Sequence, residues 1–244
     1  MALAAVAAFA GAFVQSTTGF GFALLLSPVM FAVMDPVEAV VTLLVLGLAL
    51  NVMVLFERGR PEHVDWPRLT PMLIAAVPGL ALGAVALTQL SKEALQVGVG
   101  VAVIAAAGWQ LRQRRRARPP ELPAAAGVAA GFVSGALTTS ISVSGPPVVL
   151  WLEARGAHPE EFRASLAATF LALNLAGGAV LVVAEGTGSL EVGKVLPLLG
   201  LVIAGYALGA FAFRRLNRER FYTLVLALVA VTGLASVAGG LGLF

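Results

Sequence analysis

Two stretches of this 244-residue chain return later in the chain with many of the same residues at the same spacing. Residues 36–51 match residues 159–174 at an offset of 123, and 7 of the 16 positions are identical, including the closing Leu-Ala-Leu-Asn. Residues 65–93 match residues 191–219 at an offset of 126, with 10 of 29 positions identical. An apolar chain with an internal repeat is typical of secondary transporters, whose ligand site lies between two related halves.

The composition indicates a membrane protein. The chain is 59% hydrophobic and only 12% charged, whereas soluble domains carry about 25% charged residues. The net charge of +3 is small, so it does not indicate a nucleic-acid partner. Absent cysteines exclude disulfides and thiolate chemistry. The two histidines lie in predicted loops without an HExxH pattern, and no phosphate-binding loop is present, so we expect neither an enzyme nor a cofactor.

Apolar stretches divide the chain into six ordinary spanning helices and two longer, interrupted runs. A helix that crosses ~30 Å of hydrocarbon needs about 20 residues. Residues 1–34 are interrupted at Thr17-Thr18-Gly19-Phe20-Gly21, and residues 122–152 are interrupted around Thr138–Ser144, before Gly145-Pro146-Pro147. The six predicted spans are residues 36–56, 69–90, 94–111, 160–184, 193–213 and 220–242.

The distribution of basic residues decides whether each interrupted run crosses the membrane once or turns back. If all eight runs cross, the 16 basic residues divide nine inside to seven outside. If each interrupted run is a hairpin of two short helices, 14 basic residues lie inside and only Lys92 and Lys194 lie outside. Basic residues concentrate on the cytoplasmic side of membrane proteins, so the pattern favours the hairpins.

The fold class that follows is an all-α integral membrane protein with two inverted-topology repeats, each a re-entrant helical hairpin plus three transmembrane helices. The first repeat is residues 1–111, the second is residues 122–244, and a basic linker at 112–121 joins them, with its arginine cluster at 112–118 in the cytoplasm. Within the hairpins, identical letters pair Phe13 with Phe132 and Pro28 with Pro147, at an offset of 119.

The two hairpin tips are the first candidates for a binding site. Broken helices present unpaired N–H groups and the positive end of a helix dipole, which favour anions, and hydroxyls add further donors. The same residue types also form tight turns and cap short helices, and this alternative remains open for any single residue. The candidate ligand-binding residues at the tips are Gln15, Ser16, Thr17, Thr18, Gly19, Gly21, Thr138, Thr139, Ser140, Ser142, Ser144 and Gly145.

Two asparagines extend this candidate site. Asn51 and Asn174 end the repeated Leu-Ala-Leu-Asn and fall within predicted spans. Their amides either form hydrogen bonds between helices or donate to ligand oxygens, and the sequence does not separate these roles. Glu38 and Glu161 follow helix-start prolines, where a carboxylate suits the helix dipole. The GxxxG patterns at 79–83 and 205–209 predict close helix packing.

Two motifs stand out at the interruptions: TGFGFALLLSPVM at 18–30 and SVSGPPVVLWL at 142–152. With the duplicated layout, they resemble the sulfite exporter TauE/SafE family, also called the toluene-sulfonate uptake permeases, and the resemblance covers essentially the whole chain. It implies export of small sulfur-containing anions, such as sulfite or organosulfonates, across the cytoplasmic membrane. The family's glycine-rich first motif falls on Gly19 and Gly21, followed by Pro28. Its second-half counterpart falls on Gly145, Pro146 and Pro147.

The predicted function is therefore a secondary transporter for a sulfite-type or organosulfonate anion, working by alternating access between the two halves. Two alternatives stay open: a carrier of another small anion, and an anion channel with the hairpin tips as its filter. The lipid bilayer and the anionic substrate are the expected partners. The sequence leaves open a coupling ion, either proton or sodium, and a homodimer.

Overall fold

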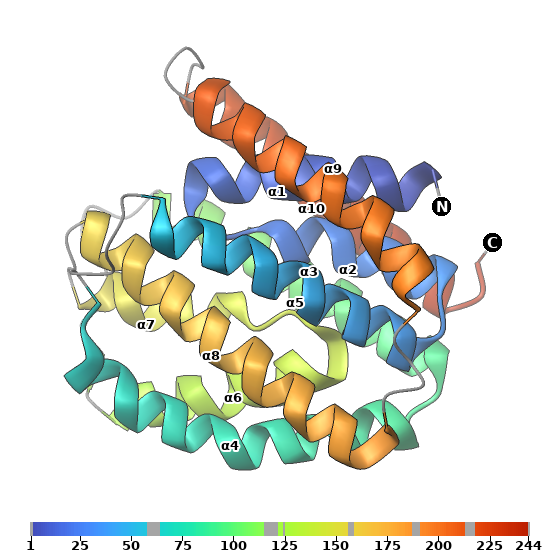
Figure 1. Cartoon of the computed structure of the whole chain (residues 1–244), viewed down its shortest axis with the longest axis horizontal. Helices are drawn as coiled ribbons and strands as arrows, with labels where there is room; N and C mark the ends of the chain where they lie inside the picture. The colour runs from blue at the N-terminus through green and yellow to red at the C-terminus, as the bar shows by residue number, and fades with distance from the viewer. Residues whose placement is uncertain are drawn as a thin grey trace.

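The computed structural model describes residues 2–57, 64–114, 122–123, 125–155, 159–186, 191–212 and 218–243, with only the backbone described at 114, 159, 212 and 218–224. This part of the chain forms helices and no strands (Figure 1). The helices are α1 (Ala2–Thr18), α2 (Phe22–Val33), α3 (Pro36–Phe56), α4 (Trp66–Gln89), α5 (Lys92–Arg114), α6 (Ala125–Ile141), α7 (Gly145–Ala154), α8 (Pro159–Glu185), α9 (Val192–Ala212) and α10 (Arg218–Gly240).

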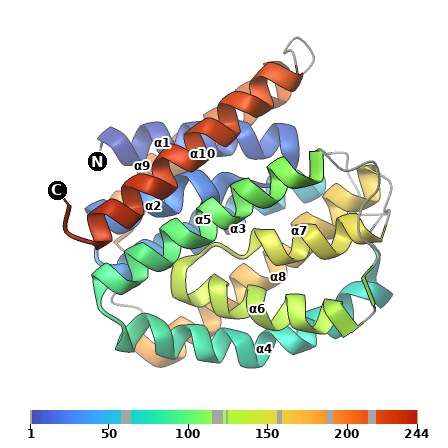
Figure 2. The same cartoon turned by 180° about the vertical axis from the view of Figure 1, so that it is seen from behind.

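Each interrupted run folds as a pair of short helices that run in opposite directions. In Figure 1, α1 leads away from the N-terminus and α2 returns toward the same end, where α3 begins. Helices α6 and α7 do the same from the opposite end of the molecule, as Figure 2 shows from behind. The breaks lie at residues 19–21 and 142–144. Each interrupted run is therefore a pair of helices, and the two pairs begin at opposite ends of the molecule, while their re-entry into a membrane stays a prediction.

Helices from the two halves of the sequence pack against each other throughout. The contacting pairs are α1 with α9, α4 with α6, α3 with α8, and α5 with α10. The first two pairs are equivalents of each other under the sequence repeat. The matched stretches lie on α3 and α8 and on α4 and α9. The division at residues 112–121 stays a prediction, since residues 115–121 lie outside the described part of the chain.

Glycines permit the closest of these contacts. A Cβ placed on Gly83 of α4 would overlap the Ala136 carbonyl and the Thr139 hydroxyl of α6. A Cβ placed on Gly209 of α9 would overlap the Ser16 hydroxyl of α1. The two GxxxG patterns thus have the packing role expected of small residues in membrane helices. Each GxxxG pattern allows one helix of a hairpin to pack closely against a helix of the other half.

Five helices among the described residues are long and apolar enough to cross a membrane: α3, α4, α5, α8 and α9. The searched part of α10, Val225–Gly240, is shorter. Large apolar side chains point outward along these helices, for example Ile74 and Val85 on α4 and Val183 on α8. Outward-facing apolar side chains along helices of this length are what a hydrocarbon surrounding requires. The chain is a multi-pass membrane protein.

Candidate functional site

A small cavity lies where the two helix breaks meet α3 and α8. Its volume is about 40 Å³. The first break contributes the start of α2, the second contributes the start of α7, and α3 and α8 supply one asparagine each. The lining residues are Gln15, Phe20, Gly21, Phe22, Ala23, Leu24, Leu43, Gly47, Asn51, Ser142, Val143, Ser144, Gly145, Phe170 and Asn174. Residues more than 120 positions apart in the sequence thus share one chamber.

The two breaks share a left-handed residue at one equivalent position, although Gly21 is left-handed and its counterpart Ser144 is not. Gly19 has a φ of +86°, and Ser142, 123 residues later, has a φ of +58°. The N–H of Gly19 donates to the Gln15 carbonyl at 2.8 Å, and the N–H of Ser142 donates to the Thr138 carbonyl at 3.1 Å. The left-handed region favours glycine and is uncommon for other residues. Ser142 therefore occupies a glycine-type position at the wall of the cavity.

This equivalence corrects the register expected within the hairpins. Aligning identical residues of the two hairpins gave an offset of 119, whereas the residues with a left-handed backbone, Gly19 and Ser142, are 123 positions apart. The starts of α2 at Phe22 and α7 at Gly145 are also 123 apart. The offset of 119 is wrong because it was set by identical residues, whereas structural equivalence is set by the position of the helix break. The structural offset is the one that relates α3 to α8.

Unpaired donors at the start of α2 face the cavity. The Phe22 N–H donates to the Gln15 side-chain oxygen at 3.3 Å. The next two N–H groups, of Ala23 and Leu24, have no acceptor among the described residues. Gly21, with a φ of +112°, precedes the helix and provides no side-chain cap. The first turn of a helix carries a partial positive charge as well as these free donors, so this end of α2 favours an anion.

The second break brings hydroxyls to the cavity, just before the start of α7. Pro146 and Pro147 have no N–H group. Ser142 and Ser144 line the cavity, and neither hydroxyl has a partner among the described residues. Both side chains are buried, with 7% and 8% of their surface exposed. The second break therefore adds buried hydroxyl donors to the cavity.

The two asparagines differ in their surroundings despite their equivalent positions. Asn51 accepts a hydrogen bond of 2.9 Å from the Gln15 side-chain nitrogen. Asn174 is half-buried, lines the cavity and has no hydrogen-bond partner in the described part of the chain. Its nitrogen lies where a Cβ on Gly47 would be only 2.7 Å away. Asn51 is held in place, whereas Asn174 is available to another donor or acceptor.

Half of the residues expected at the site line the cavity and half do not. Those that line it are Gln15, Gly21, Asn51, Ser142, Ser144, Gly145 and Asn174. Those that do not are Ser16, Thr17, Thr18, Gly19, Thr138, Thr139 and Ser140. The hydroxyls of the second group donate to backbone carbonyls. Thr138 donates to Ser134 at 2.6 Å, and Thr139 donates to Leu80 at 2.7 Å. Most of these hydroxyls thus bond to their own helix, and that of Thr139 joins α6 to α4.

Several lining residues were not expected from the sequence. They are the apolar or small residues Phe20, Phe22, Ala23, Leu24, Leu43, Gly47, Val143 and Phe170. Gly47 and Phe170 are related by the offset of 123, and each precedes its asparagine by one helical turn. Residues four positions apart share a helix face. Gly47 and Phe170 could therefore have been predicted by adding to the site the residue four positions before each asparagine.

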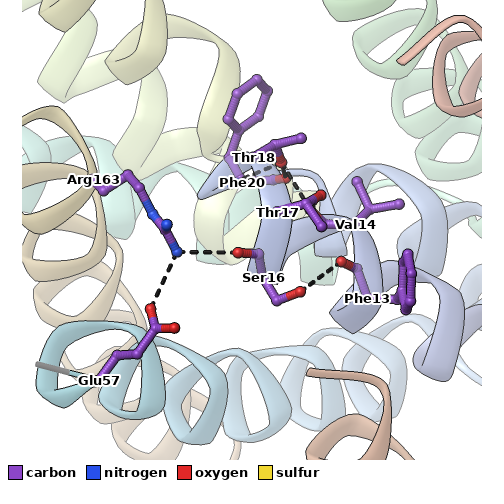
Figure 3. A network of polar contacts seen from close by, with 8 residues as sticks. All are labelled: Phe13, Val14, Ser16, Thr17, Thr18, Phe20, Glu57 and Arg163. Carbon is purple, nitrogen blue, oxygen red and sulfur yellow. Dashed lines mark hydrogen bonds and ion pairs between the residues drawn. The ribbon is translucent and has the colours of Figure 1, made fainter. Parts of the chain in front are cut away.

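The first hairpin tip is held by an arginine of the other half (Figure 3). Arg163 of α8 donates to the Ser16 carbonyl at 3.1 Å and contacts the Glu57 carboxylate at 3.3 Å. Ser16 lies in the last turn of α1, where carbonyls are unpaired and the dipole is negative. The arginine therefore caps the broken helix α1. It does not line the cavity.

The cavity is polar but uncharged. None of the described residues that line it carries an ionisable side chain. The described residues also contain no group of three or more histidine, cysteine, aspartate or glutamate side chains placed to hold a metal ion. A ligand in this chamber would be bound by neutral amides, hydroxyls, helix N–H groups and the rings of Phe20 and Phe170.

These features define a polytopic helical membrane protein with a central polar site between two broken helices, an arrangement typical of transporters. The sequence profile of the sulfite exporter TauE/SafE family matches residues 3–236. The chain belongs to this family of membrane transporters and is not an enzyme.

One relative is a probable sulfite/organosulfonate exporter TauE of Cupriavidus necator. It is 30% identical over 172 residues, which are 66% of this chain and 64% of the relative. The match thus spans just under two thirds of the relative's length. No solved structure matches the chain.

Proposed function

We propose that this protein is a secondary transporter that exports sulfite or a small organosulfonate anion across the cytoplasmic membrane. The observation that carries the proposal is the cavity at the meeting of the two helix breaks, lined by unpaired neutral donors. Transporters of this general kind place their sites where discontinuous helices meet near the middle of the membrane. The name of the Cupriavidus necator relative supports the class of substrate.

The donors suit an oxyanion. The start of α2 offers the N–H groups of Ala23 and Leu24 together with its dipole, as anion sites at helix N-termini do. Ser142 and Ser144 can donate from the opposite side, and the Asn174 amide from α8. These groups surround the ligand with donors from three helices. Because none of them is charged, the ligand is held without a full ion pair and can leave, as a carrier requires.

The size of the cavity suits a small anion. One water molecule needs at least ~10–15 Å³, so about 40 Å³ accommodates a few water-sized groups. A sulfite ion, with one sulfur and three oxygens, is of this order. A longer organosulfonate would need more room, and its organic part would lie against Phe20 or Phe170. The present arrangement of side chains therefore favours the smaller ligand.

The proposed cycle is alternating access between the two halves. The two helix pairs begin at opposite ends of the molecule (Figures 1 and 2), and residues from both breaks line one cavity. A movement of one half against the other would open the cavity first to one side and then to the other. In the proposed orientation, the 112–118 linker is cytoplasmic, in accordance with the distribution of basic residues.

Counterflow in proteoliposomes tests the proposal. Vesicles loaded with unlabelled sulfite are diluted into radiolabelled sulfite, and the competitors are sulfoacetate, taurine, thiosulfate, sulfate and acetate. We expect transient accumulation that sulfonates suppress and acetate does not. Linear, non-saturable flux without counterflow would indicate a channel. Suppression by acetate alone would indicate a different anion.

The native chain contains no cysteine, so the orientation is tested with a single cysteine placed in the 112–118 linker. An impermeant thiol reagent should label it in inside-out vesicles and not in intact cells. Labelling from outside intact cells would contradict the proposed orientation.

A further inference from the structure

Two groups of charged residues lie at opposite ends of the molecule and correspond through the sequence repeat. In the first, the Arg68 group, Arg68 contacts Asp65 at 2.7 Å and Glu161 at 3.6 Å. In the second, the Lys194 group, Lys194 contacts Glu191 at 2.9 Å and Glu38 at 2.7 Å. Arg68 and Lys194 are matched at the offset of 126, as are Asp65 and Glu191, while Glu38 and Glu161 are matched at 123.

Each group joins the two halves of the protein. Arg68 lies at the start of α4, and Glu161 lies at the start of α8. Lys194 lies at the start of α9, and Glu38 lies at the start of α3. Helices α4 and α8 begin at one end of the molecule in Figure 1, whereas α3 and α9 begin at the other. A movement that separates the halves at one end by parting these helix starts would break the contact at that end.

The contact between the two halves is shorter in the Lys194 group than in the Arg68 group. The Lys194–Glu38 contact has the length of a charge-assisted hydrogen bond, whereas 3.6 Å between Arg68 and Glu161 is beyond hydrogen-bond distance. The carboxylates also differ in exposure, since 13% of the Glu38 side chain is exposed and 30% of the Glu161 side chain. The pair between the halves is thus closed at the Lys194 end and loosened at the Arg68 end.

A hydroxyl near each group differs in the opposite sense: it is hydrogen-bonded at the Arg68 end and has no partner among the described residues at the Lys194 end. At the Arg68 end, the Asp65 backbone N–H donates to the Ser165 hydroxyl at 3.1 Å. The repeat relates Ser165 to Thr42, at the offset of 123, beside the Lys194 group. The Thr42 hydroxyl is buried, with 1% of the residue exposed, and has no hydrogen-bond partner in the part of the chain that the structure describes. A buried unpaired hydroxyl is unfavourable, so this end lacks a bond that its counterpart makes.

We infer that the two groups are the alternating gates of the transporter and that they exchange arrangements in each cycle. The inference rests on the proposed transport function. When the Lys194–Glu38 contact loosens, the Glu191 backbone N–H moves to the Thr42 hydroxyl, as the Asp65 N–H is now bonded to Ser165. The Arg68–Glu161 contact shortens at the same time and closes the opposite end. Partly exposed ion pairs contribute little stability, so both can break and re-form readily.

Accessibility of a single cysteine tests the gates without substrate. Ala23 lines the cavity, and Ala23→Cys is the reporter in a chain that has no other cysteine. An impermeant thiol reagent is applied to right-side-out and inside-out vesicles. Glu38→Gln should raise the labelling rate from the Lys194 side roughly two- to fivefold, as loss of a weak pair permits. The matched variant Glu161→Gln should raise it from the opposite side. Changes from the same side in both variants, or in neither, would overturn the inference.

The hydroxyl pair provides a second, opposed test. Thr42→Val removes the unpaired hydroxyl of the present arrangement and should lower labelling from the Lys194 side. Ser165→Ala removes a bond of the present arrangement and should raise it. Equal shifts for Thr42→Val and Ser165→Ala would contradict the exchange.

The two proposals fail separately. If labelling shifts as expected but counterflow is absent, the transport function is wrong and the movement of the two ends stands. If counterflow occurs and labelling does not respond to either carboxylate, the gates are wrong and the transport function stands.

Discussion

The Gln15 side chain donates to the Asn51 side-chain oxygen at 2.9 Å, and its own oxygen accepts the Phe22 N–H across the first helix break. One buried amide thus joins α1, the start of α2 and α3. At the equivalent position in the second half stands Thr138, whose hydroxyl donates to its own helix. The difference leaves Asn174 without the partner that Asn51 has.

Gln15→Ala should therefore damage both the fold and the site. The variant leaves the buried Asn51 oxygen unpaired, which costs about 1–3 kcal/mol. We expect a lower midpoint of thermal unfolding in detergent and a higher KM in counterflow. Gln96→Ala is the matched control, because the Gln96 side-chain nitrogen also donates a hydrogen bond, in its case to the Phe31 backbone carbonyl at 2.8 Å. It lies outside the cavity, so it should lower stability without a change in KM.

Asn174→Ala should weaken ligand binding more than it weakens the fold. The Asn174 amide has no partner to lose among the described residues, and one lost hydrogen bond to an anion corresponds to roughly tenfold in affinity. Binding of sulfite by isothermal calorimetry and unfolding in detergent give the two quantities. Asn51→Ala should weaken the fold more than it weakens ligand binding. A larger loss of stability in Asn174→Ala than in Asn51→Ala would contradict this assignment.

Two substitutions at Ser142 distinguish the effect of its hydroxyl from the effect of its left-handed backbone conformation. Ser142→Gly removes the hydroxyl and suits the φ of +58°, so it should raise stability by about 1 kcal/mol while it weakens binding. Ser142→Ala removes the hydroxyl and keeps the unfavourable conformation. Equal binding losses in both variants would assign the effect to the hydroxyl. Wild-type affinity in both would exclude Ser142 from the ligand site.

Gly83→Ala should disrupt the contact between α4 and α6, because the added Cβ would overlap the Ala136 carbonyl and the Thr139 hydroxyl. Overpacking of this kind costs about 1–3 kcal/mol, measurable as a lower unfolding midpoint. Gly98→Ala is the control, since nothing lies within 4 Å of a Cβ placed there. That variant should be neutral or stabilising, by up to ~1 kcal/mol, because alanine favours a helix.

The sequence predicts the helices of this fold well because glycine, proline and charge mark their ends. The span expected at 36–56 is α3 to the residue, while the span expected at 69–90 begins three residues earlier, at Trp66. Trp66 is followed by Pro67, and a proline in the first helical turn fits an earlier start. The two helix pairs are expected from the arginine distribution and the interruptions at 17–21 and 138–144, and the left-handed residues Gly19 and Ser142 lie within those interruptions.

The composition of the site is less predictable. Sequence identifies hydroxyl-rich breaks but does not show which face of a short helix turns inward. Thr139 turns toward Leu80 of α4, and Ser142, three residues later, faces the cavity because the helix has already ended. Serine and threonine within helices also donate to their own backbone, which removes Thr138 and Ser140 from the cavity. The aromatic lining of Phe20 and Phe170 resembles core residues in sequence.

The uncharged lining of the cavity has an electrical consequence. No described side chain in the chamber neutralises a bound anion, so the transported ion would cross with its full charge, and the empty chamber would return with none. Each elementary charge moved across 100 mV corresponds to about 2.3 kcal/mol. A resting potential that is negative inside would then drive an anion outward, and the voltage across the membrane alone would favour export.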